Sequence, residues 1–194
     1  MSDGLILASA SPRRHELLRS VGFAFVVEPA DVDEAERPGE DAVRYVERVA
    51  RAKADAIAER RGSLDGCVIL AADTTVDVDG VILAKPVDDG DARRMLGLVS
   101  GRTHLVHTAV VCRHAGRVLA ETVTTGVTFV ALSDDDIEWY LALGEHRDKA
   151  GAYAMQGAAG AFVERLDGSP TNVIGLPLAE TCRLLRTAGL RVAP

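Results

Sequence analysis

The stretch "LILASASPRR", residues 5–14, decides the fold because a short apolar run passes directly into a helix start. The apolar residues predict a buried strand over residues 5–8. Ser11 and Pro12 then predict a helix, with a side-chain oxygen at its cap and a proline at the first helical position. This helix would place Arg13 and Arg14 in its first turn, where the helix dipole opposes each cation by roughly 0.3–1 kcal/mol. We therefore expect an anionic partner beside the helix start.

Strand and helix patterns alternate outward from this unit. The predicted elements of the first half are a helix at 12–21 ending at Gly22, an extended segment at 23–27, a helix at 41–60 and an apolar strand, "CVILAAD", at 67–73. This alternation is typical of an α/β protein. The elements predicted next are a hairpin turning at Asp79 and Gly80, a helix at 88–100, an antiparallel meander over 103–130 around Gly116 and Gly126, a helix from Ser133 to residue 143, a strand near 161–166 and a helix at 177–187.

Length and composition indicate a globular chain made of one large domain or two small ones. The chain is 47% hydrophobic and long enough to bury a core of its own. Its three cysteines are odd in number and far apart, which favours reduced thiols. The sequence lacks a membrane-length apolar run and a signal peptide, so we expect a cytoplasmic protein with no membrane partner. A net charge of −7 and an aromatic content of 4% disfavour stable nucleic-acid binding.

Arginine is the ordinary cation of this chain. Of its 22 basic residues only Lys53, Lys85 and Lys149 are lysines. A lysine can persist where a compact ammonium is required, and codon bias is the alternative explanation.

A lysine also stands on the apolar stripe of the helix predicted over residues 41–60. Lys53 would face the core there, and a buried ammonium needs a partner. Asp73 closes the apolar strand, at the kind of strand end where α/β proteins place ligands. A two-residue hairpin turn would set Lys85 opposite Thr74, next to Asp73 in the chain. The alternatives are a snorkelling Lys53 and a peripheral salt bridge between Asp73 and Lys85.

The segment "EPADVDEAERPGE", residues 28–40, gathers six carboxylates ahead of this helix. Such a concentration suits a hard divalent cation, although runs of carboxylates are more often simply solvated. No serine stands in a nucleophile elbow and no cysteine has a base beside it in sequence, so covalent catalysis has little support. A cationic helix start, inward lysines, a strand-end aspartate and an acidic loop together indicate metal-assisted hydrolysis of a phosphate ester or anhydride.

Seven segments spread over nearly the whole chain resemble, in order, the motifs of the Maf family of nucleoside triphosphate pyrophosphatases, first associated with septum formation. They are "LASASPRR", "VDE" at 32–34, "ARAKA" around Lys53, "AADTTV", "ILAKP", "DKAGAYAMQG" and "GSPTNVIGLPL". The resemblance implies a single domain over residues 1–194, with an α/β fold similar to that of inosine triphosphatase. It consists of an elongated, twisted mixed sheet with helices, in two lobes around a central cleft.

Carried over by motif, the resemblance implies roles for nine residues. Asp73 would be the general base or a metal-bound acid assisted by Glu34, and these two carboxylates would hold a divalent cation, Mg²⁺ or Mn²⁺. The implied catalytic residues are Asp73, Glu34, Lys53 and Lys85, and the implied substrate-binding residues are Ser9, Arg13, Arg14, Thr74 and Gln156. The phosphates would lie against Ser9, Arg13, Arg14, Lys53 and Lys85.

Arg13, Thr74 and Gln156 match the branch of the family that prefers dTTP and UTP to 7-methyl-GTP. Gln156 offers both a donor and an acceptor, which suits the imide edge of uracil or thymine. The implied reaction is attack of water on the α-phosphorus, which releases a nucleoside monophosphate and pyrophosphate and clears surplus or modified nucleotides. A link to septum formation and division arrest, and a homodimer, are further implications of the resemblance. The alternative is a non-catalytic nucleotide-sensing or partner-binding protein in cell division, which would have no need of Asp73.

Overall fold

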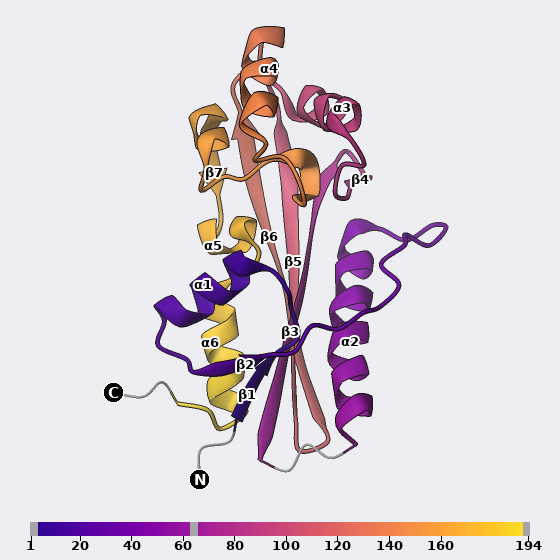
Figure 1. Ribbon diagram of the computed structural model, residues 1–194, viewed down its shortest axis with the longest axis vertical. Helices are drawn as coiled ribbons and strands as arrows, with labels where there is room; N and C mark the ends of the chain where they lie inside the picture. The colour runs from indigo at the N-terminus through magenta and orange to yellow at the C-terminus, as the bar shows by residue number, and fades with distance from the viewer. Residues whose placement is uncertain (1–3, 63–65, 192–194) are drawn as a thin grey trace.

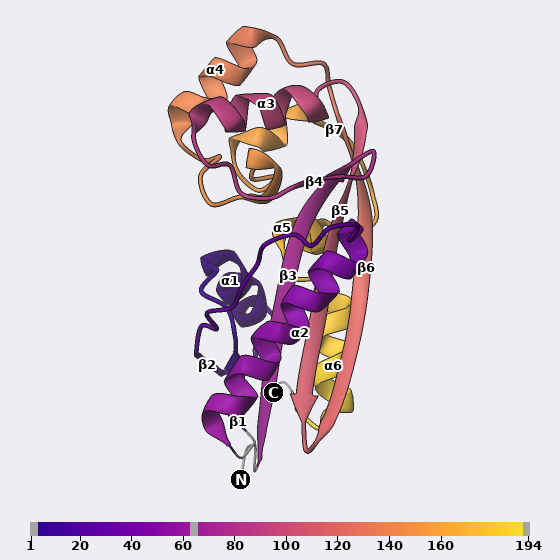
Figure 2. The same ribbon diagram turned by 90° about the vertical axis from the view of Figure 1, so that its right-hand side faces the viewer.

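One twisted mixed sheet runs the length of an elongated molecule, and helices cover it in two lobes (Figure 1 and Figure 2). The computed structural model describes residues 4–62 and 66–191. Its strands are β1 (Gly4–Leu7), β2 (Phe25–Val27), β3 (Cys67–Val78), β4 (Val81–Leu83), β5 (Thr103–His114), β6 (Arg117–Phe129) and β7 (Val163–Asp167). Its helices are α1 (Pro12–Ser20), α2 (Ala42–Arg61), α3 (Asp89–Val99), α4 (Asp134–Leu143), α5 (Pro170–Ile174) and α6 (Leu178–Thr187), with short 3₁₀ turns η1 (Ala150–Ala152) and η2 (Ala158–Phe162).

The strand order of the sheet is β2-β1-β3-β5-β6-β7, with β4 paired to β3. The β1 strand is parallel to both β2 and β3, and the remaining pairs are antiparallel. β1 and β4 share one edge of the long strand β3. The β1 register ends at the pair Leu7 and Leu70, and the β4 register begins at Val76 and Leu83. The stretch of β3 between these two registers therefore has neither β1 nor β4 beside it.

The core divides according to the faces of this sheet. In the lower lobe α2 packs on one face around Val46, Ile57 and Ile69, whereas α6 packs on the other around Leu70 and Leu185 (Figure 2). The side chains of β3 alternate between these faces, as the two-residue period of a strand requires. The upper lobe packs α3, α4 and the 3₁₀ turns against the far parts of β3, β5 and β6.

The predicted α/β class, the mixed sheet and the two-lobed arrangement are confirmed. The hairpin turn at Asp79 and Gly80 is confirmed, since both residues have positive φ and Val78 pairs with Val81. The capped helix after Ser133 is also confirmed, because Ser133 and Asp136 form a capping box. The expected domain limits, residues 1 and 194, lie outside the described residues.

Three local predictions were wrong. The segment 103–130 is a single long hairpin turning at Ala115 and Gly116, and Gly126 lies inside β6 opposite Leu105. The side chain of Ser11 makes no cap bond on α1. Asp73 does not end its strand, because β3 continues to Val78. What ends near Asp73 is the pairing with β1, which a single sequence cannot reveal.

The described residues contain no helix that is both long and apolar enough to cross a membrane. All three cysteines are free thiols, as expected. Cys112 is fully buried on β5, and burial raises the pKa of its thiol to about 12.

Candidate active site

A cleft of about 880 Å³ opens between the lobes, beside the part of β3 that neither β1 nor β4 covers. Its walls come from the β1–α1 loop, the acidic loop and α2 on the lower side, and from residues 145–157 on the upper side. All nine residues for which the resemblance implies a role line this cleft: Ser9, Arg13, Arg14, Glu34, Lys53, Asp73, Thr74, Lys85 and Gln156. The structure therefore brings the whole predicted set together.

A buried lysine joins two carboxylates on the lower wall. Lys53 Nζ lies 2.8 Å from Asp73 Oδ1 and 2.7 Å from Glu34 Oε1. Lys53 and Asp73 meet because both occupy the face of the sheet that α2 covers. Lys53 is 8% exposed, so the snorkelling alternative is wrong, and Asp73 is 6% exposed. Each carboxylate keeps a second oxygen that Lys53 does not engage.

The two carboxylates differ in their proton affinity. Burial raises the pKa of Asp73, although Lys53 and Arg14 oppose this shift. Glu34 is also partly desolvated, but its hydrogen bond and charge interaction with Lys53, helped by Lys85, bring its pKa below the ordinary value. A carboxylate with a raised pKa is a better proton acceptor for catalysis, whereas one with a lowered pKa stays ionised.

Side chains of α2 hold the acidic loop, residues 28–40, in a position that brings Glu34 to Lys53. Tyr45 on α2 donates from its hydroxyl to the Glu34 carbonyl at 3.0 Å. Arg48 donates to Glu40 and to the Ala35 carbonyl, with distances of 2.7 to 2.9 Å. Glu34 is the carboxylate of this loop that lines the cleft. Across residues 4–62 and 66–191, no three His, Cys, Asp or Glu side chains converge on a metal position.

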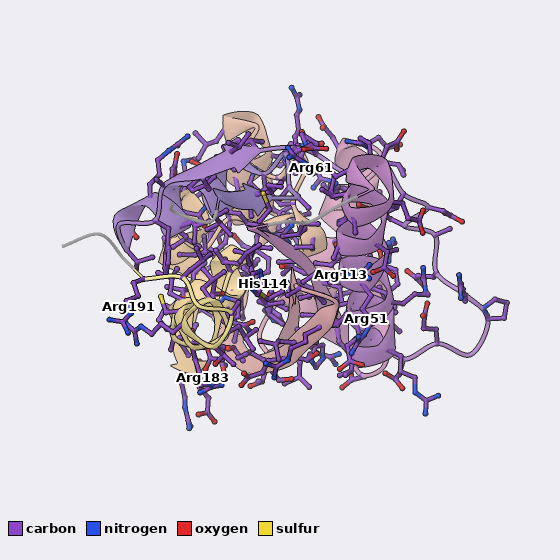
Figure 3. The ribbon with its side chains drawn as sticks, turned by 90° about the horizontal axis from the view of Figure 1, so that it is seen from below. Arg51, Arg61, Arg113, His114, Arg183 and Arg191 are labelled. Carbon is purple, nitrogen blue, oxygen red and sulfur yellow. The ribbon has the colours of Figure 1, made fainter. Side chains whose placement is uncertain are left out.

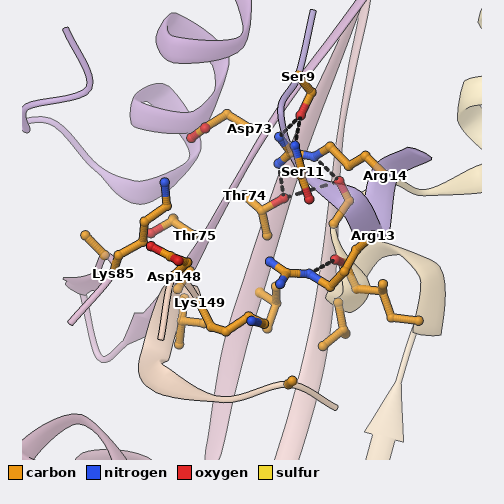
Figure 4. A pocket seen from close by; sticks show the side chains of 18 of the residues that line it. Ser9, Ser11, Arg13, Arg14, Asp73, Thr74, Thr75, Lys85, Asp148 and Lys149 are labelled. Carbon is orange, nitrogen blue, oxygen red and sulfur yellow. Dashed lines mark hydrogen bonds between the residues drawn. The ribbon is translucent and has the colours of Figure 1, made fainter. Parts of the chain in front are cut away.

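Arg14 is buried under the β1–α1 loop and takes its partners from three segments (Figure 4). It donates to the Gly175 carbonyl at 2.8 Å, to Thr74 Oγ1 at 2.9 Å and to Ser9 Oγ at 3.3 Å. Ser9 Oγ also accepts from the Ser11 backbone at 3.2 Å. Neutral oxygens thus take part of the role expected of an anion. Burial nevertheless lowers the pKa of Arg14, so its charge still gains from a nearby anion.

Thr74 has its hydroxyl committed to the protein. Thr108 Oγ1 donates to the Asn172 carbonyl at 2.9 Å, so the 2.9 Å contact between Thr74 and Thr108 is a donation from Thr74. Thr74 in turn accepts from Arg14. This series of hydrogen bonds fixes the Arg14 guanidinium in place.

The remaining predicted residues, Arg13, Lys85 and Gln156, lie in three different parts of the cleft wall. Arg13 lies in the first turn of α1, half-buried, with Nε 3.4 Å from the Ile174 carbonyl. Lys85 is exposed, so its expected inward orientation was wrong. It follows the end of β4 rather than pairing with Thr74. Gln156 lies on the upper wall, after η1.

Sequence reasoning missed α5 and the charged pair Asp148 and Lys149, all of which border the cleft. Ser169 and Pro170 begin α5 with the same Ser-Pro signature that predicted α1, so a signal was present. Gly175 ends α5 at a φ of 123°, which lets its carbonyl reach Arg14. Asp148 and Lys149 open the segment "DKAGAYAMQG", and Lys149 is one of only three lysines, so a signal was present for this pair as well.

Taken together, a mixed α/β sheet and a cleft with cations around a carboxylate pair define a protein built to receive a phosphorylated ligand. Residues 4–188 match the family model of the Maf-like protein, and the chain belongs to this family.

Relatives align along almost the whole chain. A dTTP/UTP pyrophosphatase of Anaeromyxobacter dehalogenans strain 2CP-1 is 52% identical over 193 residues, covering 97% of this chain and 96% of the relative. Proteins of the same name from Chromobacterium violaceum and Hahella chejuensis are 51% and 47% identical, covering 97% of this chain and 96% and 94% of their own lengths. Among solved structures, the Staphylococcus aureus Ham1 protein aligns with a TM-score of 0.47 and 14% identity, covering 65% of this chain and 71% of that one.

Proposed function

We propose that this chain is a nucleoside triphosphate pyrophosphatase that hydrolyses the α–β phosphoanhydride of dTTP, UTP and modified pyrimidine nucleotides. The products are the nucleoside monophosphate and pyrophosphate. The observation that carries the proposal is the contact of buried Lys53 with buried Asp73 and with Glu34, in a cleft that also holds Arg14 and Lys85. The names of the relatives support the substrate class.

The phosphates are held by the lower wall and the β4 end of the cleft. The Ser9 hydroxyl faces the ligand from the β1–α1 loop, Arg14 from α1, Lys53 from α2, and Lys85 from beyond β4. A triphosphate carries several negative charges, and fixed cations around it stabilise the charge that develops as the anhydride breaks.

The residues present fit a divalent cation, Mg²⁺ or Mn²⁺. Asp73 and Glu34 each approach Lys53 Nζ with one oxygen, and the second oxygen of each is not engaged by Lys53. Two carboxylates are the usual protein share of a site completed by phosphates and water. Such an ion would neutralise phosphate charge and lower the pKa of a bound water.

Asp73 accepts a proton from the attacking water as its general base, or would hold the cation together with Glu34. Its raised pKa suits the first role, and its unengaged Oδ2 is open to either. Lys53 keeps Asp73 and Glu34 together and oriented. The water oxygen bonds to the α-phosphorus, the bond to the bridging oxygen breaks, and pyrophosphate leaves with that oxygen.

We assign the base to the side of the cleft formed by Arg13 and Gln156. The Gln156 amide offers a donor and an acceptor to the imide of uracil or thymine. Thr74 acts through Arg14, because its hydroxyl accepts from that guanidinium and donates to Thr108.

Four broader features belong to the same proposal. The match over residues 4–188 supports a single domain that carries the activity. A cytoplasmic location follows from the nucleotide substrates. A homodimer and a role in septum formation rest on the family resemblance.

The proposal is tested with a panel of nucleoside triphosphates in Mg²⁺ or Mn²⁺, scored for pyrophosphate release. We expect dTTP and UTP to lead the panel. Binding without release of pyrophosphate from any nucleotide would instead favour the non-catalytic sensing protein.

Asp73→Asn supplies the matched variant for the panel, since it changes one carboxylate oxygen into an amide. Turnover should fall by about two orders of magnitude or more, the range for loss of a general base, while nucleotide binding is kept. Near-normal release from a folded Asp73→Asn protein would remove Asp73 from the mechanism.

A further inference from the structure

The three lysines of this chain all line the cleft. Arginines serve as cations elsewhere on the molecule, as Figure 3 shows at the end away from α4, where Arg61, Arg113 and Arg183 stand out. Each of these three is paired with a carboxylate, respectively Glu28, Asp55 and Glu121. Lys53 and Lys85 have roles in the proposed function, but Lys149 does not. Its presence in the cleft calls for a ligand group of its own.

The charges of the cleft form two groups. The inner group contains Arg14, Lys53 and Lys85 with Asp73 and Glu34, whose charges act on one another. It has an excess of cations, and a divalent metal would increase this excess.

The outer group contains Arg13 and Lys149 with Asp148 and Glu145, two cations against two carboxylates. The polyanionic triphosphate therefore belongs with the inner group. The balanced outer group fits a neutral, polar part of the ligand, namely the base.

Lys149 lies beside Arg13, and its ammonium has N–H donors that remain available to a ligand. Its Nζ donates to the Arg147 carbonyl at 3.0 Å, and an ammonium has three N–H donors. Burial and the nearby charge of Arg13 lower the pKa of Lys149, while Asp148 and Glu145 oppose the shift. Figure 4 shows the Lys149 and Arg13 side chains reaching into the same part of the cleft.

The segment that carries these residues has an unusual and well-supported backbone. Asp148 and Ala152 are two of the four non-glycine residues with positive φ in the described chain, at 57° and 60°. Gly151 donates to the Ala84 carbonyl at 3.2 Å, and a Cβ at Gly151 would come within 2.8 Å of Val76. Left-handed backbone outside glycine concentrates at functional sites, where the surroundings hold it in place.

Resting on the proposed function, we propose that Asp148 and Lys149, together with Arg13, read the imide edge of the pyrimidine base. Uracil and thymine present one N–H between two carbonyl oxygens. Asp148 supplies the acceptor for the N–H in place of the Gln156 amide oxygen. Lys149 and Arg13, which only donate, join the Gln156 amide N–H as partners for the two carbonyls, each of which can accept two bonds. Cytosine presents an amino group and a bare ring nitrogen instead of this pattern, so it would leave a cation or the carboxylate unmatched.

Binding of reaction products tests this assignment without need of turnover. The affinities of dTMP, dCMP and inorganic pyrophosphate are measured by calorimetry for the wild type, Lys149→Met and Asp148→Asn. Arg147→Met is the control, since it removes a neighbouring exposed cation that does not line the cleft. A melting curve confirms that each variant is folded.

Lys149→Met should weaken the affinity for dTMP by about tenfold or more, the range for loss of a hydrogen bond to a charged group. It should leave the affinity for pyrophosphate unchanged. Asp148→Asn should narrow the preference for dTMP over dCMP by about tenfold, because its amide can donate to the cytosine ring nitrogen. The assignment would be overturned if Lys149→Met bound pyrophosphate more weakly but dTMP with unchanged affinity. It would also be overturned if Asp148→Asn kept the wild-type preference for dTMP over dCMP. Failure of the wild type to cleave dTTP would instead contradict the proposed function, so the two failures are distinct.

Discussion

Replacing Lys53 with methionine separates the electrostatic role of this residue from its packing. The methionine fills the space of the lysine alkyl chain on the apolar stripe of α2, so little packing energy is lost. What disappears is the ammonium that lies within 2.8 Å of both Asp73 and Glu34. The variant therefore leaves two neighbouring carboxylates without their shared partner.

The cost is dominated by Asp73. Its side chain is 9% exposed, whereas that of Glu34 is 39% exposed and can turn to water. Removing one partner of a buried ion pair costs about 3–5 kcal/mol, and we expect about 3 kcal/mol at pH 7 because Arg14 still faces Asp73. For a chain of this length, that loss lowers the melting temperature by roughly 6–12 °C.

The loss should depend on pH in a defined direction. Burial already raises the pKa of Asp73, and without Lys53 it rises further. A carboxyl whose pKa is higher in the folded state binds more protons folded than unfolded, so acid favours the folded variant. The stability gap between wild type and Lys53→Met should therefore be widest near pH 7 and narrow toward pH 5.

Urea unfolding at both pH values measures the gap. Arg51→Met, an exposed cation on the same helix, should change the free energy of unfolding by less than about 0.5 kcal/mol. The double variant Lys53→Met/Asp73→Asn should recover most of the lost stability. If Lys53→Met matches the wild type at pH 7, or the double variant is no more stable than Lys53→Met, the electrostatic reasoning is refuted.

Lys85→Met should change the free energy of unfolding by less than about 0.5 kcal/mol, because Lys85 is exposed, yet lower kcat/KM for dTTP about tenfold or more; normal kinetics would remove Lys85 from phosphate binding. Gln156→Glu should lower kcat/KM for dTTP and UTP by about tenfold or more, since it removes an amide donor and adds a charge. An equal loss for ATP would argue against base recognition. Burial lowers the pKa of His104 from 6.5 to about 4, so protonation of the unfolded chain should destabilise the wild type by about 3 kcal/mol between pH 6.5 and pH 4. Urea unfolding of His104→Phe should lack this part of the pH dependence, and parallel curves for the two proteins would contradict it.

Local chemistry made much of the fold predictable. The Ser11–Pro12 helix start, the Asp79–Gly80 turn and the stripe that carries Lys53 each depend on neighbouring residues, and each was found where the pattern placed it. The five-residue α5 is too short for periodicity to detect. Gly126 resembles a turn residue, but its pairing with Leu105 decides its conformation.

The site was predictable in membership but not in arrangement. The motif resemblance picked out Ser9, Glu34 and Gln156, although they come from distant parts of the chain. That Thr74 acts on Arg14 depends on a contact across 60 residues of chain. That Ile174 and Gly175 supply carbonyls to Arg13 and Arg14 depends on contacts across 161 residues. Residues 148 and 149 belong to a recognised motif, but their place in the cleft depends on positive φ at Asp148 and on the close approach of Gly151 to Val76, which the motif does not reveal.

The three long strands β3, β5 and β6 extend from one lobe into the other (Figure 2), so both walls of the cleft stand on a single ladder of hydrogen bonds. Closure of the two lobes over the cleft would bend or break hydrogen bonds of that ladder. The free energy of binding of a small ligand can hardly offset this loss. The opening therefore has a nearly set width. An incoming nucleotide therefore meets both walls at a spacing that the sheet fixes, so the side chains that line those walls decide which base is accepted.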